Sequence, residues 1–168
     1  MANQPEPWLR GPLEGVDAFI APLLYSLEQA REDIAAHTAH LTTEQLWERP
    51  NGAAPAGFHI RHLARAADRL MTYLEGGQLS AEQMAALRSE MEPGATREEL
   101  LEEMAALLDR VESAARAIDA ASLTEPRKVG RKELPTTVIG LLVHIAEHTQ
   151  RHVGQAITTA RLTGIRLP

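Results

Sequence analysis

The sequence predicts an all-α protein, a four-helix bundle with short additional helices in its connections. Apolar residues recur at helical spacing in four long segments, aromatic residues make up only 4% of the chain, and no segment reads as a convincing strand. Leu, Ala, Ile and Val must therefore fill the interior, which suits packed helices better than a β-sandwich. A bundle is the natural way for four amphipathic helices to bury their apolar faces.

The first long helix is expected from about Leu13 to His40. Its apolar residues at helical spacing are Val16, Phe19, Ile20, Leu23, Leu24, Leu27, Ile34 and Leu41. Pro22 lies inside this pattern, so the helix is either kinked there or begins near it. A capping signal at Thr42 then predicts a short helical turn around Gln45 to Trp47, before a loop rich in Pro and Gly.

The second long helix is expected from about Gly57 to Glu75, stopped by the glycine pair that follows. Its core stripe is Ile60, Leu63, Ala67, Leu70 and Leu74. Ser80 caps a short helix, AEQMAALRSEM, which Pro93 and Gly94 end.

Thr96, with Glu99 three residues later, forms a capping box that opens the third long helix. This helix continues through Leu100, Met104, Leu107, Leu108, Val111, Ala115 and Ile118. A polar connection from about Leu123 to Pro135 leads to the fourth helix, from about Thr136 to Arg161. Gly164 and Pro168 are expected to end it.

The composition fits one bundle domain over residues 1–168, with residues 1–12 as a Pro-rich N-terminal arm. A net charge of −6 with 17 basic residues argues against nucleic acid as a partner. The absence of cysteine excludes disulfides, thiolate zinc sites and a cysteine nucleophile. No signal-peptide pattern or membrane-length apolar run is visible, so a cytoplasmic protein without a membrane partner is expected.

Three histidines stand four residues apart on the fourth predicted helix: His144, His148 and His152. Neighbours at this spacing share a helix face and can direct two imidazoles at one metal ion. All three positions span about 12 Å, so only two neighbours can bind the same ion. The alternative is that they are half-exposed surface histidines.

A third ligand would have to come from another helix, and the second helix offers His59 and His62. By helical angle His59 lies nearer the centre of the apolar stripe and His62 nearer its flank, which mildly favours His59. His37 and His40, late in the first helix, form a weaker pair that we interpret as surface residues.

The segments GFHIRHLARAADRL and HIAEHTQRHVGQA, with LTTEQLWERP and the terminal GQAITTARLTG, resemble the DinB/YfiT-like superfamily of metal-dependent enzymes. This family is distinct from the DNA polymerase that shares the name. The resemblance implies a four-helix bundle in which one histidine of the second helix and an H-x-x-x-H pair of the fourth bind a metal. Carried over to this sequence, the implied ligands are His62, His148 and His152. His144 has no ligand role in the match and is interpreted as a packing residue or a neighbour of the ligands.

Three neutral imidazoles leave a divalent ion its full charge and open positions for water or substrate, as in catalytic sites. Zinc, nickel and iron all accept imidazole, so the sequence does not select the metal. Gln155, Glu147 and Arg151 lie within one turn of the ligands and could orient an imidazole or a substrate. The alternative for each is an ordinary surface residue.

The resemblance implies a metal-dependent hydrolase, or an S-transferase that uses a low-molecular-weight thiol such as bacillithiol or mycothiol, acting on a small-molecule substrate. It also implies a homodimer. The main alternative is a non-catalytic stress-response protein that binds a metal or small ligand. A third reading is a structural bundle whose histidines are there by chance.

Overall fold

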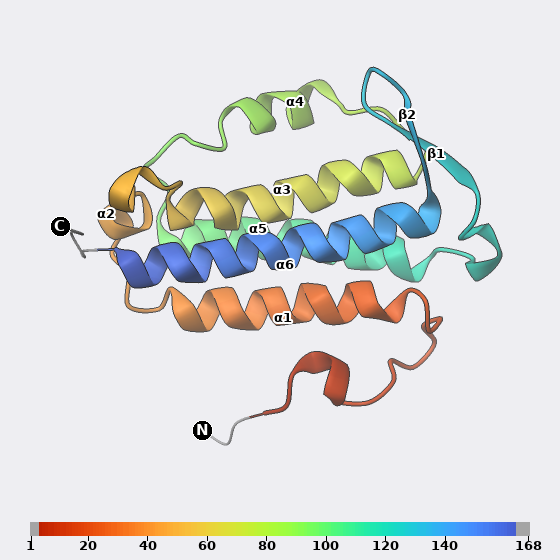
Figure 1. The fold of residues 1–168 in the computed structure, drawn as a ribbon, viewed down its shortest axis with the longest axis horizontal. Coiled ribbons are helices and arrows are strands. Elements are labelled where there is room, and N and C mark those ends of the chain that lie inside the picture. Colours follow the sequence, from red (N-terminus) through yellow and green to blue (C-terminus); the bar gives the residue numbers. More distant parts are fainter. Residues whose placement is uncertain (1–3, 164–168) are drawn as a thin grey trace.

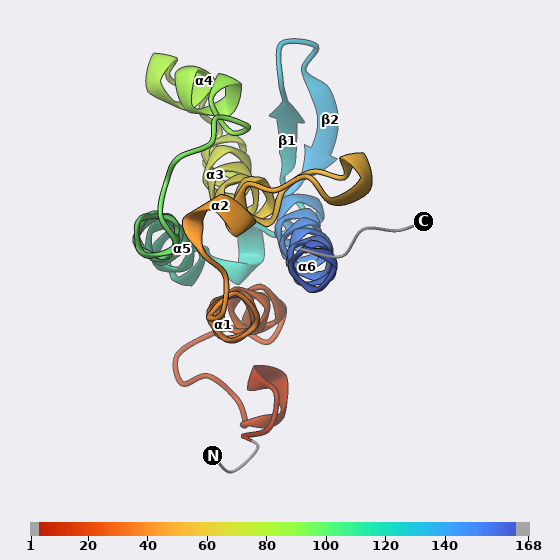
Figure 2. The ribbon, with the colours of Figure 1, turned by 90° about the vertical axis from the view of Figure 1, so that its left-hand side faces the viewer.

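Four long helices, packed side by side, dominate the computed structural model, which describes residues 4–163. They are α1 (Ala21–His37), α3 (Ala56–Leu74), α5 (Arg97–Arg116) and α6 (Val138–Leu162), as Figure 1 shows. Seen end-on in Figure 2, α3 lies against both α5 and α6, and α1 packs against the same two helices from the opposite side. The all-α fold class predicted from the sequence is confirmed.

Short helices occupy the connections, as the sequence predicts: α2 (Thr43–Leu46) and α4 (Ala81–Arg88). Capping boxes begin three helices, at Thr42, Ser80 and Thr96, where the side-chain oxygen accepts a hydrogen bond from the backbone N–H three residues later. The 3-10 helices are η1 (Pro7–Leu9), η2 (Pro50–Gly52) and η3 (Ala120–Ser122). α4 lies outside the four long helices, along α3 (Figure 2).

The first long helix begins at Ala21, not near Leu13. Pro22 is in its first turn, where the missing N–H costs nothing, so the proline marks the start of the helix and not a kink. Phe19, predicted to lie within the helix with the other apolar residues at helical spacing, precedes the helix and is 67% exposed. At the other end of the chain, the helix stop predicted at Gly164 and Pro168 lies outside the described residues.

The connection before α6 contains two short strands that the sequence analysis missed. β1 (Pro126–Val129) and β2 (Leu134–Thr137) pair antiparallel, with Val129 opposite Leu134. These strands are mostly polar and bury no face fully, so they lack the alternation of apolar residues by which a strand is recognised. The base of the hairpin is tied to α6, because the backbone N–H of Val138 donates to the carbonyl of Glu125.

The core between the long helices is aliphatic, as the composition predicts. Its largest fully buried side chains are Ile20, Leu23, Leu27, Ile34, Leu46, Ile60, Leu63, Met71, Leu100, Leu108, Val111 and Ile145. α3 runs between α5 and α6, and residues on nearly every side of it are buried. Packing therefore fixes the rotation of α3 about its own axis. Within residues 4–163, no helix combines the length and the apolar character needed to cross a membrane.

Candidate metal centre

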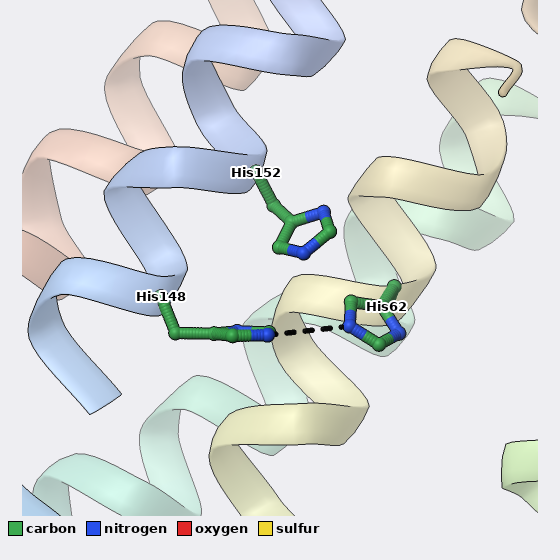
Figure 3. A group of neighbouring side chains, drawn as sticks. All are labelled: His62, His148 and His152. Atoms are coloured by element: carbon green, nitrogen blue, oxygen red, sulfur yellow. Dashed lines mark hydrogen bonds between the residues drawn. The ribbon is translucent and has the colours of Figure 1, made fainter. Parts of the chain in front are cut away.

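His62 of α3 and His148 and His152 of α6 converge between the two helices. Each offers one ring nitrogen, and these three atoms lie within 4.8 Å of one another. Figure 3 shows the three rings turned toward one space, with His148 and His152 on successive turns of one helix and His62 facing them. All three side chains are half-buried, so the cluster is neither sealed in the core nor fully in solvent.

The spacing of the nitrogens fits a metal ion. His62 Nε2 and His148 Nε2 are 3.4 Å apart. An ion bound tetrahedrally at about 2.05 Å from each nitrogen would hold two such ligands about 3.3 Å apart. The ring of His152 lies close to both, with centroid distances of 4.4 Å to His62 and 4.6 Å to His148. The donor set therefore suits a divalent transition metal.

His59 occupies a different place from the three converging histidines. It is more deeply buried, at 6% exposed, as its position near the centre of the apolar stripe predicts. Its Nδ1 lies 3.0 Å from His152 Nδ1. His59 therefore contacts His152 without being one of the three converging residues, whereas His62 is one of them. The preference for His59 from helical angle alone does not match this geometry.

Burial keeps several of these imidazoles neutral. Burial first, and the neighbouring His62 second, lower the pKa of His59 and of His148 to about 4 and that of His152 to about 3. At neutral pH these rings carry no charge, and neutral imidazole is the form that binds a metal. A metal ion bound here would therefore displace few protons from these residues.

A buried carboxylate, Glu90, stands behind His62. Its Oε2 lies 2.6 Å from His62 Nδ1, and its Oε1 accepts a hydrogen bond of 2.7 Å from Arg69 Nη1. Burial acts to raise the pKa of Glu90, but the bonds from His62 and Arg69 outweigh it and lower that pKa. Sequence reasoning did not single out this residue, because it lies in a polar connection 28 positions from its partner and no local pattern marks it.

The residues near His148 and His152 on α6 contact mainly one another. His144 is about half exposed, and its Nδ1 lies 2.7 Å from Glu147 Oε1. Arg151 donates to the same carboxylate, so Glu147 is occupied on the outer surface of the helix. His144 lies outside the converging group but its ring packs 5.6 Å from that of His148, consistent with a packing neighbour. Gln155 is exposed.

Phe58 covers part of the cluster. Its ring stacks on that of His62, with centroids 5.1 Å apart and planes inclined by 25°, and it meets the His152 ring edge-on. Stacking restricts rotation of His62 and places an apolar surface beside the nitrogens.

The two histidines predicted late in the first helix lie outside this group. On α1, His37 is half-buried, and His40 beyond the helix end is exposed.

The fold and the site define an all-α protein with an imidazole cluster between two packed helices. A family model described as the DinB superfamily matches residues 26–156, a range that includes His62, His148 and His152, and the chain belongs to that superfamily. The family predicted from the sequence is thus confirmed.

The fold is also similar to a solved structure, the crystal structure of the conserved protein of locus from Enterococcus faecalis. The two share 20% sequence identity with a TM-score of 0.70, over 88% of this chain and 98% of the other. At this identity the likeness concerns the fold alone. No curated protein matches the chain significantly.

Proposed function

We propose that this protein binds one divalent transition metal ion through His62, His148 and His152. The observation that supports it is the convergence of three ring nitrogens from two helices within 4.8 Å, with one pair at 3.4 Å. Helices α3 and α6 contact each other along their length, so the ligands would sit on a rigid frame. Zinc, nickel and ferrous iron all suit an imidazole donor set.

We further propose that the site is catalytic. Three neutral ligands leave coordination positions open, and a bound ion would supply either a water of lowered pKa or a stabilised thiolate. The protein's own part is to hold the three imidazoles, to keep them neutral through burial, and to offer the Phe58 ring as an apolar wall. A small-molecule substrate would approach the half-buried side of the cluster.

Two reaction classes fit this arrangement: hydrolysis, and S-transfer from a low-molecular-weight thiol such as bacillithiol or mycothiol to an electrophile. The transferase class is favoured by the resemblance of the sequence motifs to DinB-like enzymes, and it requires no cysteine from the protein, which has none. The alternative is a protein that binds a metal or small ligand without turnover. It is supported by the position of Glu90, which is bonded to His62 and Arg69 and so is not free to serve as a general base.

The metal proposal is tested by measuring the metal content of purified protein. Wild type is expected to hold about one equivalent of metal after loading and gel filtration, and the double variant His148→Ala plus His152→Ala almost none. The matched control is His37→Ala plus His40→Ala, which removes two histidines outside the cluster and should retain the metal. Equal metal in wild type and the His148/His152 variant would exclude the site and favour the reading of chance histidines.

Catalysis is tested on the metal-loaded protein. Electrophilic aromatic halides are supplied with a series of thiols, and activated esters are supplied alone, with the His148/His152 variant as the blank. A rate that depends on both the metal and one thiol supports the transferase, and a metal-dependent rate with esters alone supports the hydrolase. Metal binding without any such rate would favour the non-catalytic alternative.

A further inference from the structure

Glu90 is a buried carboxylate, 3% exposed, with two hydrogen-bond donors converging on it. We propose that Glu90 is a positioning residue that fixes His62 in the tautomer offering Nε2 to the metal. This inference rests on the proposed metal-binding function and names the residue on which the α3 ligand depends. A metal-bound histidine commonly donates its outer N–H to such a partner, which sets both ring orientation and tautomer.

The chemistry follows from what each atom can do. A carboxylate only accepts hydrogen bonds, so at 2.6 Å from Glu90 Oε2 the His62 Nδ1 must carry the proton. In the neutral ring the lone pair then lies on Nε2, the atom 3.4 Å from His148 Nε2. The contact with Glu90 therefore aims the free lone pair of His62 into the cluster.

Arg69 stabilises the charge of the buried Glu90 carboxylate and requires that its Oε1 accept a hydrogen bond. An isolated ionised carboxylate would be costly to bury, and the Arg69 guanidinium, on α3 two turns beyond His62, compensates its charge at 2.7 Å. Because Arg69 always donates, both oxygens of Glu90 must accept. An amide at position 90 has only one acceptor oxygen. If that oxygen faces Arg69, its NH₂ faces His62 Nδ1 and forces the proton to Nε2, the wrong tautomer for a ligand.

The backbone around Glu90 is fastened to α3 by a second arginine. Arg61 Nη1 donates to the carbonyl oxygens of Ser89, Glu90 and Glu92, at 3.3, 3.4 and 2.7 Å. The Arg61 guanidinium also lies over the Trp47 ring, 4.7 Å from its centroid. Three carbonyls on one buried donor group fix the path of residues 89–92, so the connection after α4 presents the carboxylate at a defined position.

The test compares Glu90→Gln with Glu147→Gln. The second is a matched control, because Glu147 makes the same kind of contact, 2.7 Å to a histidine Nδ1, with His144 outside the converging group. Zinc affinity is measured by competition with a chromophoric chelator, and the visible spectrum of the cobalt-loaded protein reports ligand geometry. Glu90→Gln is expected to bind zinc about 10- to 100-fold more weakly with an altered cobalt spectrum. Glu147→Gln should match wild type in both measurements.

A measurement on wild type keeps the inference testable if Glu90→Gln fails to fold. Nitrogen-15 NMR of the metal-free protein at pH 8 identifies the tautomer of each histidine. His62 is expected to be protonated at Nδ1, and an Nε2-protonated His62 would overturn the proposal. Unchanged zinc affinity in folded Glu90→Gln would also overturn it. If wild type binds no zinc at all, the proposed function fails, whereas the tautomer of His62 still reports on Glu90 separately.

Discussion

The two α3 histidines give the sharpest test of the site, because they occupy different roles only 3 positions apart. In His62→Ala, we expect metal binding to fail, since the change removes a nitrogen that lies 3.4 Å from His148 Nε2. In His59→Ala, we expect the metal to remain bound more weakly. His59 Nδ1 lies 3.0 Å from His152 Nδ1, and His59 is not among the three converging residues.

The expected magnitudes follow from these contacts. Loss of an outer hydrogen-bond partner typically costs about 10- to 100-fold in metal affinity, or about 1.4–2.7 kcal/mol. His59→Ala should fall in that range. His62→Ala leaves only the two α6 ligands, so its loss should exceed about 100-fold, beyond what an outer partner accounts for.

The assay combines chelator competition for zinc with thermal unfolding in the presence and absence of the metal. At a free zinc concentration 100 times the dissociation constant, binding stabilises the folded wild type by about 2.7 kcal/mol. His59→Ala should keep part of this stabilisation at the same concentration, and His62→Ala should lose it. Unfolding without metal controls for damage to the fold in each variant.

The reasoning would be refuted by an exchange of roles. If His59→Ala abolished zinc binding while His62→Ala retained it within tenfold, the second-helix ligand would be His59. The geometry of the three converging nitrogens would then not describe the metal-bound protein.

Two further predictions concern stability. In metal-free protein the free energy of unfolding should fall as the pH is lowered from about 6.5 toward 4. In the folded protein burial holds the pKa of His59 and His148 at about 4 and that of His152 at about 3. In the unfolded chain the same histidines bind protons near pH 6.5, so the unfolded state gains protons first. Each histidine contributes at most about 1.4 kcal/mol per pH unit to this fall. Urea unfolding at a series of pH values, with a chelator present, should show a weaker dependence of the unfolding free energy on pH in His152→Asn. An unfolding free energy of the wild type that does not change between pH 6.5 and 5 would contradict the burial argument. Separately, Thr96→Ala should lower the free energy of unfolding by about 0.5–2 kcal/mol, because the Thr96 hydroxyl caps the backbone N–H of Glu99 at the start of α5. Thr96→Ser, which keeps that oxygen, is the control, and an equal loss in both variants would argue against the cap.

Local signals in the sequence located the helices well. The helix N-caps at Thr42, Ser80 and Thr96 could be predicted because they are local signals, and in the structure each of them begins a helix with a capping box. The i, i+4 pair His148 and His152 was readable for the same reason, since helical periodicity alone places both on one face. The family resemblance added His62, which the residues of this chain alone did not favour over His59.

Other features depended on contacts between distant segments. The β1–β2 hairpin was missed because its strands bury no apolar face. Phe19 was predicted within the first helix, but the helix begins at Ala21. In both cases the spacing of apolar residues did not predict the local structure. That structure depends on the contacts of the segment with the rest of the protein.

The sequence by itself determined that four long helices form, where three of the helices are capped, and that α6 presents two histidines on one face. Only the tertiary structure decided that His62 turns toward them, with His59 in contact with His152. The rotation of α3 between α5 and α6 fixes that choice, and a stripe containing many small residues does not define the rotation. Only the tertiary structure, too, brought Glu90 to His62 across 28 positions, because that contact depends on how the connection after α4 folds back onto α3.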